Sequence, residues 1–226
     1  MTISSLIRIR PVGVSANNIP ILAWFIGDKS GEIIHFYGGV HGDEPEGVDL
    51  ALQLKDYLMK SQSQFPNHFL IVVPVINPDG YEAKNRVNGH GVDLNRNFKT
   101  KDWVSTSKES RYYPGPHSDS EPETQALVKL IKEYPPKKII SFHSLIPHQI
   151  NYDGPAKALA EAMSQKNNYP VTENIGYPTP GSLGSYAGIE RNIPVITYEL
   201  PEKITPREAW KESFEAILVA ISYKLE

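Results

Sequence analysis

The chain has 226 residues, of which 22% are charged and 40% hydrophobic, and its formal net charge is −3. This length suits one compact domain over residues 1–226, and the composition excludes a disordered or membrane-embedded chain. We expect no nucleic-acid partner, because such a partner would need a basic face. Cysteine is absent, which excludes disulfides and thiolate metal sites and fits a reducing compartment.

The N-terminal segment, residues 1–15, has no apolar run of signal-peptide length, and no segment approaches the length of a membrane span. We therefore expect a cytoplasmic protein without a membrane partner. The sequence leaves homodimer formation open.

The first half of the chain alternates strand-like and helix-like segments. Apolar runs over 19–27 and 33–37 predict two strands, and the turn at 28–31 predicts that they pair as a hairpin. One apolar face and a proline in the first turn predict a helix over 46–60. The nearly continuous apolar run over 69–76 predicts a strand covered on both faces.

The second half continues this alternation. Capping-box sequences at Ser120 and Thr205 predict the starts of two helices. Strands are expected over 138–142 and 194–198, with a helix over 155–166 between them. The alternation indicates an α/β fold, an α/β/α sandwich with a mixed, largely parallel central sheet. Ligands of such sheets bind outside the carboxyl ends of the strands.

One long segment, residues 99–119, lacks any helix or strand periodicity. It carries Trp103, Tyr112 and Tyr113 and a Pro-Gly-Pro turn. Loops of this length are often functional, and the sequence does not decide whether this one closes over a substrate.

Two segments that follow predicted strands supply the ligand set of a hydrolytic zinc ion. His41 and Glu44 are three residues apart in a glycine-containing turn, which lets both side chains face one point. His143 follows the strand over 138–142. Taken singly, each residue has a purely structural explanation: Glu44 could cap the next helix, and His143 could bond a backbone group. Together, two histidines and one carboxylate indicate one zinc ion per chain with a fourth position open for water, although manganese or cobalt could replace it.

Glu199 follows the strand over 194–198 and reaches the same edge of the sheet. A carboxylate at this place has a purely structural explanation, which is a salt bridge. The functional alternative is a general base that takes a proton from the attacking water and passes it to the leaving amine. Partial burial would raise its pKa toward neutrality.

Arginine and asparagine side chains form a third group of candidates. Arg96 lies between two asparagines in the segment 92–98, and with Asn95 it offers a planar donor array suited to a carboxylate. Arg86 lies ten residues earlier and can reach the same cleft. One explanation of Arg86 is a solvated surface charge. The functional alternative is that it stabilises the oxyanion of a tetrahedral intermediate.

The motifs HGDE, NPDG, VDLNRNF, FHS and YELP occur in this order within residues 38–201, with an arginine between the second and the third. In these motifs the sequence resembles the zinc metallocarboxypeptidase family of carboxypeptidase A type. The resemblance implies a zinc carboxypeptidase-like fold with zinc held by His41, Glu44 and His143. It also suggests that Asp43 orients a histidine ligand.

The same resemblance implies roles for the other candidates. Glu199 would be the general base and acid, and Arg86 would polarise the scissile carbonyl. Asn95 and Arg96 would bind the free carboxylate of the leaving residue. The family also uses a mobile tyrosine over the substrate, for which Tyr186 is the candidate.

Within the family, the chain is similar to the bacterial murein peptide amidases in the runs HGDEPEG, SEPET, GSLGS and ELP. This similarity implies a cytosolic recycler of cell-wall peptides that cleaves the amide bond between γ-D-glutamate and meso-diaminopimelate. The substrate would be a small peptide whose leaving residue keeps a free carboxylate for Arg96. The zwitterionic end of diaminopimelate needs polar pocket residues, and the candidates are Tyr152, Asp153, Tyr177 and Ser185.

Other functions stay open at this point. An N-acyl amino acid deacylase of the aspartoacylase and succinylglutamate desuccinylase type shares the metal pattern and the DLNR run, but NPDG and ELP favour the carboxypeptidase branch. A general zinc carboxypeptidase would keep the site and lose the wall substrate. A non-catalytic zinc-stabilised binding module is disfavoured because every expected chemical group is present. An exported wall-lytic peptidase would need a leader.

Overall fold

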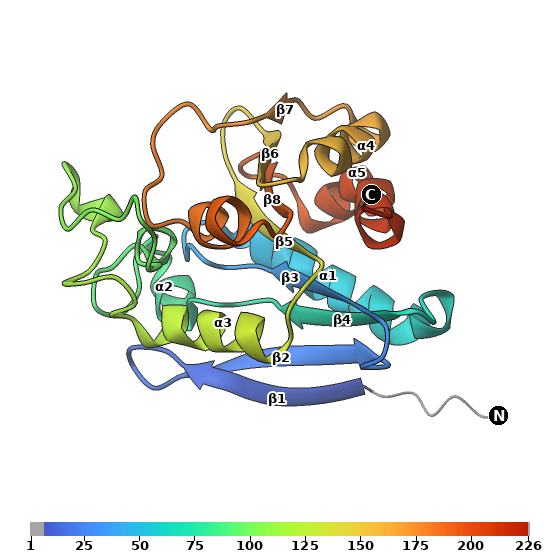
Figure 1. Ribbon diagram of the computed structural model, residues 1–226, viewed down its shortest axis with the longest axis horizontal. Helices are drawn as coiled ribbons and strands as arrows, with labels where there is room; N and C mark the ends of the chain where they lie inside the picture. Colours follow the sequence, from blue (N-terminus) through green and yellow to red (C-terminus); the bar gives the residue numbers. More distant parts are fainter. Residues whose placement is uncertain (1–6, 226) are drawn as a thin grey trace.

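The computed structural model describes residues 7–225, in which one eight-stranded sheet carries helices on both faces (Figure 1). The strands are Ile7–Val14 (β1), Pro20–Gly27 (β2), Glu32–Tyr37 (β3), His68–Val73 (β4), Lys138–Ser144 (β5), Gln149–Asp153 (β6), Val171–Thr172 (β7) and Val195–Leu200 (β8). The α-helices are Pro45–Ser61 (α1), Pro78–Ala83 (α2), Pro122–Glu133 (α3), Lys157–Asn167 (α4) and Pro206–Ser222 (α5). Shorter helical turns span Gln62–Gln64 (η1), Leu94–Arg96 (η2), Ser110–Tyr112 (η3) and Gly184–Ile189 (η4).

The strands lie in the order β1-β2-β4-β3-β5-β8-β6-β7. Four of the seven neighbouring pairs are parallel, and three of these four join the central strands β4, β3, β5 and β8. The sheet is thus mixed and parallel at its centre, and the predicted α/β/α sandwich is confirmed. No helix within residues 7–225 has the length and apolar character needed to cross a membrane.

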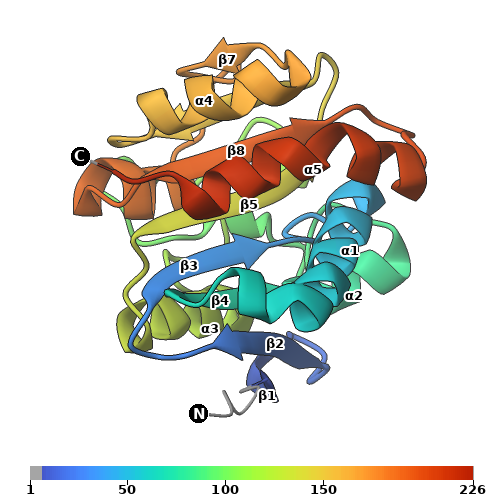
Figure 2. The same ribbon diagram turned by 90° about the vertical axis from the view of Figure 1, so that its right-hand side faces the viewer.

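Each face of the sheet has its own hydrophobic core. Helices α1, α4 and α5 cover one face, and α3 with the π-helix η4 covers the other; Figure 2 shows α1 and α5 in front of the sheet and α3 behind it. Side chains alternate between the two cores along a strand, so in β5 Ile140 and Phe142 enter the first core and Ile139 enters the second. The same alternation holds in β4, where Leu70 and Val72 enter the first core and Phe69, Ile71 and Val73 enter the second. Burial on both faces explains why β4 reads as a nearly continuous apolar run.

The parallel strands bring the predicted chemical groups to one edge. His143 in β5 lies directly opposite Glu199 in β8. Each is the penultimate residue of its strand and does not belong to the loop beyond it. His41 follows β3 in a turn that packs tightly on α2. A side chain at Gly42 would collide with the backbone of Gly80 in α2, so glycine is required there.

The predicted hairpin between β2 and β3 is wrong. Strand β4 lies between them, antiparallel to β2 and parallel to β3, and β2 forms its hairpin with β1, which the sequence did not predict. The turn after β2 carries the chain across the start of β4, where Gly31 passes against the backbone of Asn67 and His68. Pairing with β4 and β5 lets β3 bury both faces, and this gain outweighs the local turn signal.

The two predicted capping boxes have different outcomes. Thr205 and Glu208 form the reciprocal capping box at the start of α5, as expected. At α3, Glu121 is the N-cap and makes no side-chain cap bond. The hydroxyl of Ser120 instead accepts a hydrogen bond from Asn97 and donates one to Glu121. The tertiary contact with Asn97 therefore replaces the local cap.

Candidate metal centre and active site

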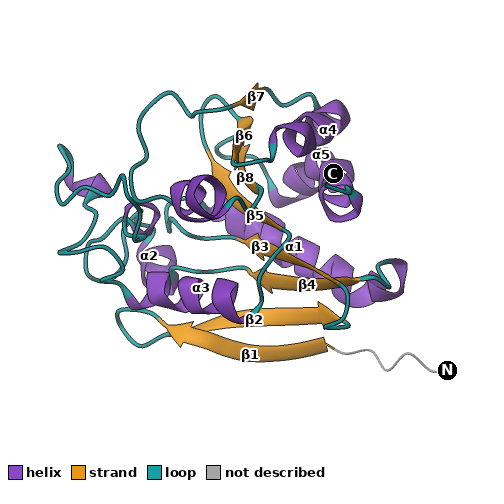
Figure 3. Cartoon of the chain, viewed as in Figure 1, coloured by secondary structure: helices purple, strands orange, loops and turns teal. Residues whose placement is uncertain are grey.

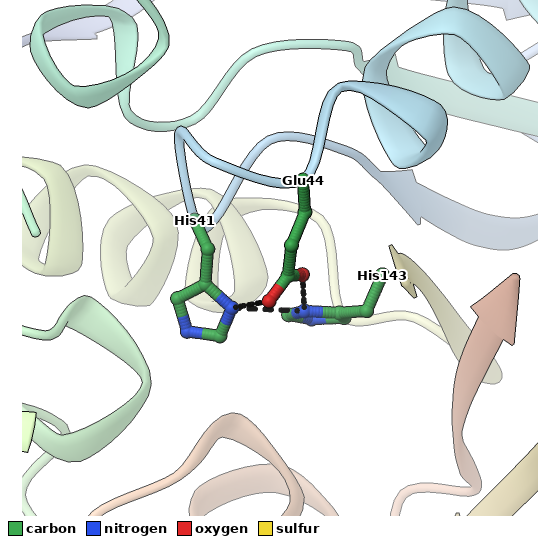
Figure 4. Close-up of side chains that lie close together, drawn as sticks. All are labelled: His41, Glu44 and His143. Atoms are coloured by element: carbon green, nitrogen blue, oxygen red, sulfur yellow. Dashed lines mark hydrogen bonds and ion pairs between the residues drawn. The ribbon is translucent and has the colours of Figure 1, made fainter. Parts of the chain in front are cut away.

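Three side chains converge at the edge of the sheet (Figure 4). His41 Nδ1 lies 2.8 Å from Glu44 Oε1, and His143 Nδ1 lies 2.8 Å from Glu44 Oε2. The two Nδ1 atoms are 3.2 Å apart. Among residues 7–225, His41, Glu44 and His143 are the group of metal-ligating side chains whose ligand atoms all lie within 4.8 Å of one another. The structure therefore brings the three predicted ligands together.

The donor set of this triad fits a zinc ion. His41 Nε2 lies 3.2 Å from Asp93, whose carboxylate only accepts hydrogen bonds, so Nε2 carries the proton and the Nδ1 lone pair points at Glu44. His143 Nε2 is bonded to the Ser141 hydroxyl at 3.0 Å, and its Nδ1 faces the same point. Two imidazole lone pairs beside one carboxylate favour a cation between them, and nitrogen and oxygen donors of this kind suit zinc.

The electrostatics of the triad also favour positive charge. Burial lowers the pKa of His41, as does the charge of Arg86, but the carboxylates of Glu44 and Asp93 outweigh both and raise it. Burial alone would raise the pKa of Glu44, yet positive charge carried by protonated His41 and His143, whose place a metal ion takes when it is bound, holds that pKa well below its usual range. Glu44 is therefore an ionised ligand.

Asp93 takes the role that the sequence suggested for Asp43. Asp93 is fully buried and bonds His41, whereas Asp43 lies outside the site, 3.7 Å from Arg111. The Asp43 prediction is wrong because the turn directs this side chain away from the metal-facing rings. Asp93 is the acidic residue of the VDLNRNF motif and precedes Arg96 by three residues. This position is the sequence signal that could have identified it as the partner of His41.

Glu199 lies beside the metal centre, only 5% exposed, and lines the same cleft. Burial raises its pKa to about 7, with the charge of His143 opposing the shift and that of Glu44 reinforcing it. A carboxyl group with this pKa can both accept and donate a proton near neutral pH. The structure thus brings Glu199 into the same cleft as the metal centre, and its role as general base stays a prediction.

The two predicted arginines are buried and line the cleft together with Asn95. Arg86 donates to Asp93 Oδ2 from Nε at 3.0 Å, and its Nη1 lies 3.2 Å from Glu44. Arg96 donates from Nη1 to the carbonyl oxygen of Asn95 at 2.7 Å. Arg86 is therefore fixed by two carboxylates beside the metal centre, while Arg96 keeps donors free to bind a ligand.

The predicted tyrosine is in the wrong place. Tyr186 is 2% exposed and packs in the second core, with its ring 5.4 Å from that of Phe98 and under the guanidinium of Arg191. It is absent from the described residues that line the cleft, whereas Tyr177 is among them. The π-helical turn that carries Tyr186 directs the ring into the second core. No helical turn was predicted from the sequence at this position.

The cleft also contains part of the pocket predicted for the side chain of the leaving residue. Asp153 and Tyr177 line it, together with Asn151, Ser182 and Thr197. Ser185 instead donates to Asp102 at 2.8 Å, and Tyr152 packs against the first core. Two of the four predicted pocket residues are thus in the cleft.

Comparison with known proteins decides the family. The sequence profile of the zinc carboxypeptidases matches residues 1–215 of the chain. The chain belongs to the zinc carboxypeptidase family. It is therefore a zinc-dependent metallopeptidase, and the triad of His41, Glu44 and His143 is the place where it can hold the ion.

Individual relatives agree with this assignment. Murein peptide amidase A of Escherichia coli strain K12 is 33% identical over 195 residues, which cover 80% of this chain and 76% of that protein. Murein peptide amidase A of Vibrio campbellii is 32% identical over 175 residues, which cover 72% of this chain and 67% of that protein.

Solved structures of this zinc carboxypeptidase's relatives show the same fold. The crystal structure of murein-tripeptide amidase from Escherichia coli O157 is 29% identical with a TM-score of 0.76, and the match covers 96% of this chain and 93% of that one. Carboxypeptidase A from Helicoverpa armigera is 21% identical with a TM-score of 0.84, covering 98% of this chain and 70% of that one. The second likeness concerns the fold alone.

Proposed function

We propose that this zinc carboxypeptidase acts on murein peptides and cleaves the amide bond between γ-D-glutamate and meso-diaminopimelate, in the cytoplasmic recycling of cell-wall peptides. The observation that carries the proposal is the pairing of Arg96 with Asp153 in one cleft. The relatives named murein peptide amidase, at 33% and 32% identity, support the class of substrate.

The chemistry of the leaving residue explains this pairing. Diaminopimelate leaves with a free carboxylate beside the cut bond and an ammonium group at the far end of its side chain. Arg96 and Asn95 provide donors for the carboxylate. Among the described residues, none forms a hydrogen bond or ion pair with the Asp153 carboxylate, which faces the cleft and is available to an ammonium group. Asn151 and Ser182 line the same region and can bond the distal carboxylate.

Each residue of the site has a defined part in hydrolysis. When bound, zinc supplies a Lewis acid at the scissile carbonyl. Glu199 takes the proton of the attacking water and later transfers it to the amine of diaminopimelate. Arg86 donates hydrogen bonds to the oxyanion that forms on the former carbonyl oxygen. Arg96 holds the leaving residue in register with these groups, which lowers the entropic cost of reaction.

The test is mass-spectrometric product analysis of the zinc-loaded protein with L-Ala-γ-D-Glu-meso-diaminopimelate. A peptide ending in an ordinary L-residue and an N-acetyl amino acid run in parallel. We expect release of free diaminopimelate, abolished by a chelator and restored by zinc. Cleavage of the plain peptide alone would favour a general carboxypeptidase. Cleavage of the acyl amino acid alone would favour the deacylase reaction and refute the proposal.

A further inference from the structure

The loop before α3 places an aromatic ring against both arginines of the cleft. This segment is drawn in green in Figure 1 and is mostly loop in Figure 3. Tyr112, at the end of η3, is half-buried. Its ring centroid lies 5.1 Å from the guanidinium carbon of Arg86 and 5.6 Å from that of Arg96. The ring of Tyr177 lies 6.3 Å away at an angle of 44°.

The two arginines are restrained in different ways. Arg86 is fixed by hydrogen bonds to Asp93 and Glu44. Among the described residues, Arg96 has no ion-pair partner, and its one side-chain hydrogen bond goes to the carbonyl of its neighbour Asn95. The direction of the Arg96 guanidinium therefore depends on the surfaces against which it packs, and these are the rings of Tyr112 and Tyr177.

An aromatic face suits this position for an electrostatic reason. Two guanidinium groups in one cleft repel each other, and the π-face of a tyrosine carries negative potential that attracts both. No hydrogen bond to the Tyr112 hydroxyl is found among residues 7–225, so the contact uses the ring rather than the hydroxyl. An aliphatic side chain such as leucine would stay apolar but would attract neither cation.

Residues on either side of Tyr112 tie the ring to the metal centre. Arg111 lies 3.7 Å from Asp43 in the metal-binding turn. The carbonyl oxygen of Tyr113 accepts a hydrogen bond at 2.8 Å from the backbone of Asp93. The backbone bond from Asp93 therefore places the Tyr112 ring close to the residue that bonds both His41 and Arg86, and from there the ring contacts Arg96.

We propose that Tyr112 is a positioning residue that holds the guanidinium of Arg96 in place for the carboxylate of the leaving residue. The inference rests on the proposed function, in which Arg96 binds that carboxylate. Tyr112 does not bond the substrate itself, and it leaves Arg86, which two carboxylates fix independently, in place. Loss of the ring should therefore weaken carboxylate recognition and leave the chemical step almost unchanged.

The test compares three variants on a peptide with a free C-terminal carboxylate and on its carboxyl-amidated analogue. Tyr112→Leu should raise the KM for the carboxylate about fivefold to tenfold, as expected for one cation–π contact, with kcat and the amidated analogue little affected. Tyr112→Phe should behave as the wild type, because the ring remains. Tyr113→Leu is the matched control, since its exposed side chain lies next in sequence, and it should also match the wild type.

A second readout avoids turnover altogether. Calorimetric binding of free diaminopimelate to zinc-loaded Glu199→Gln protein should weaken by the same factor when Tyr112→Leu is added. Equal losses on the carboxylate and the amide would show that Tyr112 only supports the fold and would overturn the inference. The inference would also be overturned if Tyr112→Leu kept the wild-type ratio of KM values between the amidated and the free-carboxylate peptide. A wild-type enzyme with no such preference would overturn the Arg96 assignment first and the role of Tyr112 with it.

Discussion

Asp93 Oδ1 lies 3.2 Å from His41 Nε2, on the side of the ring opposite the metal-facing Nδ1. The other oxygen of the same carboxylate accepts a hydrogen bond from Arg86. Burial would raise the pKa of Asp93, but the charges of His41 and Arg86 hold it well below its usual range. One ionised side chain therefore fixes both a metal ligand and the arginine beside the metal centre.

This relationship predicts the effect of Asp93→Asn. The amide keeps the shape of the side chain but removes the charge that sets the His41 tautomer, so zinc affinity should fall about 10- to 100-fold. Competition with a chromophoric chelator measures this affinity. Asp43→Asn is the matched control and should keep wild-type affinity, because its carboxylate pairs with Arg111 outside the site. Unchanged affinity in Asp93→Asn would contradict the assignment.

Glu199→Gln should separate proton transfer from metal binding. The amide cannot accept a proton, so turnover should fall about 10²- to 10⁴-fold, while metal content stays at the wild-type level. His143→Ala should lose the metal as well, because it removes a ligand. Elemental analysis and steady-state turnover on the same preparations check both expectations, and a fully active Glu199→Gln would refute the proposed mechanism.

The metal ligands were predictable because His143 lies near the end of β5, and His41 and Glu44 lie in the turn that follows β3. Parallel strands end at one edge of a sheet, so these segments meet there. His143 and Glu199 face each other in register, a relation that follows from two parallel central strands. The spacing of His41 and Glu44 within a glycine turn is a local signal that needs no knowledge of the fold. Single-domain organisation, homodimer formation and cytoplasmic location stay predictions.

The failed predictions share a physical cause. The β2–β3 hairpin rested on a turn signal, but strand pairing is decided by which faces are buried, and β4 takes the place between them. The sequence position of Tyr186 favours a tyrosine over the substrate, but the π-helical turn buries its ring against Phe98. In each case the outcome depends on contacts between residues far apart in the chain.

Arg96→Ala tests directly whether Arg96 binds the free carboxylate of the leaving residue. Removing the guanidinium should raise the KM for a free C-terminal carboxylate about 10- to 100-fold, the range of a charge-assisted hydrogen bond. The carboxyl-amidated analogue should be affected much less. Steady-state kinetics measure the change in KM for both substrates. An equal increase in KM for the two would argue against carboxylate binding by Arg96.

Thr205→Ala tests the confirmed capping box at the start of α5. The variant leaves a backbone N–H without its partner, so the free energy of unfolding should fall by about 1 kcal/mol. Ser120→Ala serves as a comparison, because its hydroxyl makes tertiary contacts instead of a cap. Urea denaturation followed by circular dichroism measures both, and an unchanged midpoint for Thr205→Ala would show that the box adds nothing to stability.

Asp153 predicts a pH dependence specific to substrates with a side-chain ammonium. Burial raises the pKa of Asp153 to about 6, and the carboxylate of Asp102 adds to the shift. Below that pH the group is neutral and cannot pair with an ammonium, so the KM for the diaminopimelate peptide should rise as pH falls from 7 to 5. With a peptide ending in alanine, every other titrating group of the enzyme, including Glu199, acts as before. The ratio of the two KM values between pH 5 and 7 therefore isolates Asp153.

Asp153→Asn should remove this pH dependence and raise the KM for the diaminopimelate peptide about tenfold at pH 7, where a charge-assisted contact is lost. The variant should remain folded. The pKa of Asp153 in the folded protein lies above the ordinary value of an aspartate, so the folded protein binds this proton more tightly than the unfolded chain does. The free energy of unfolding therefore falls as pH rises through the interval between these two pKa values. An ionised Asp153 therefore costs stability at neutral pH, and its neutral replacement avoids that cost. A KM ratio that still changed with pH in Asp153→Asn would assign the ammonium contact to another group.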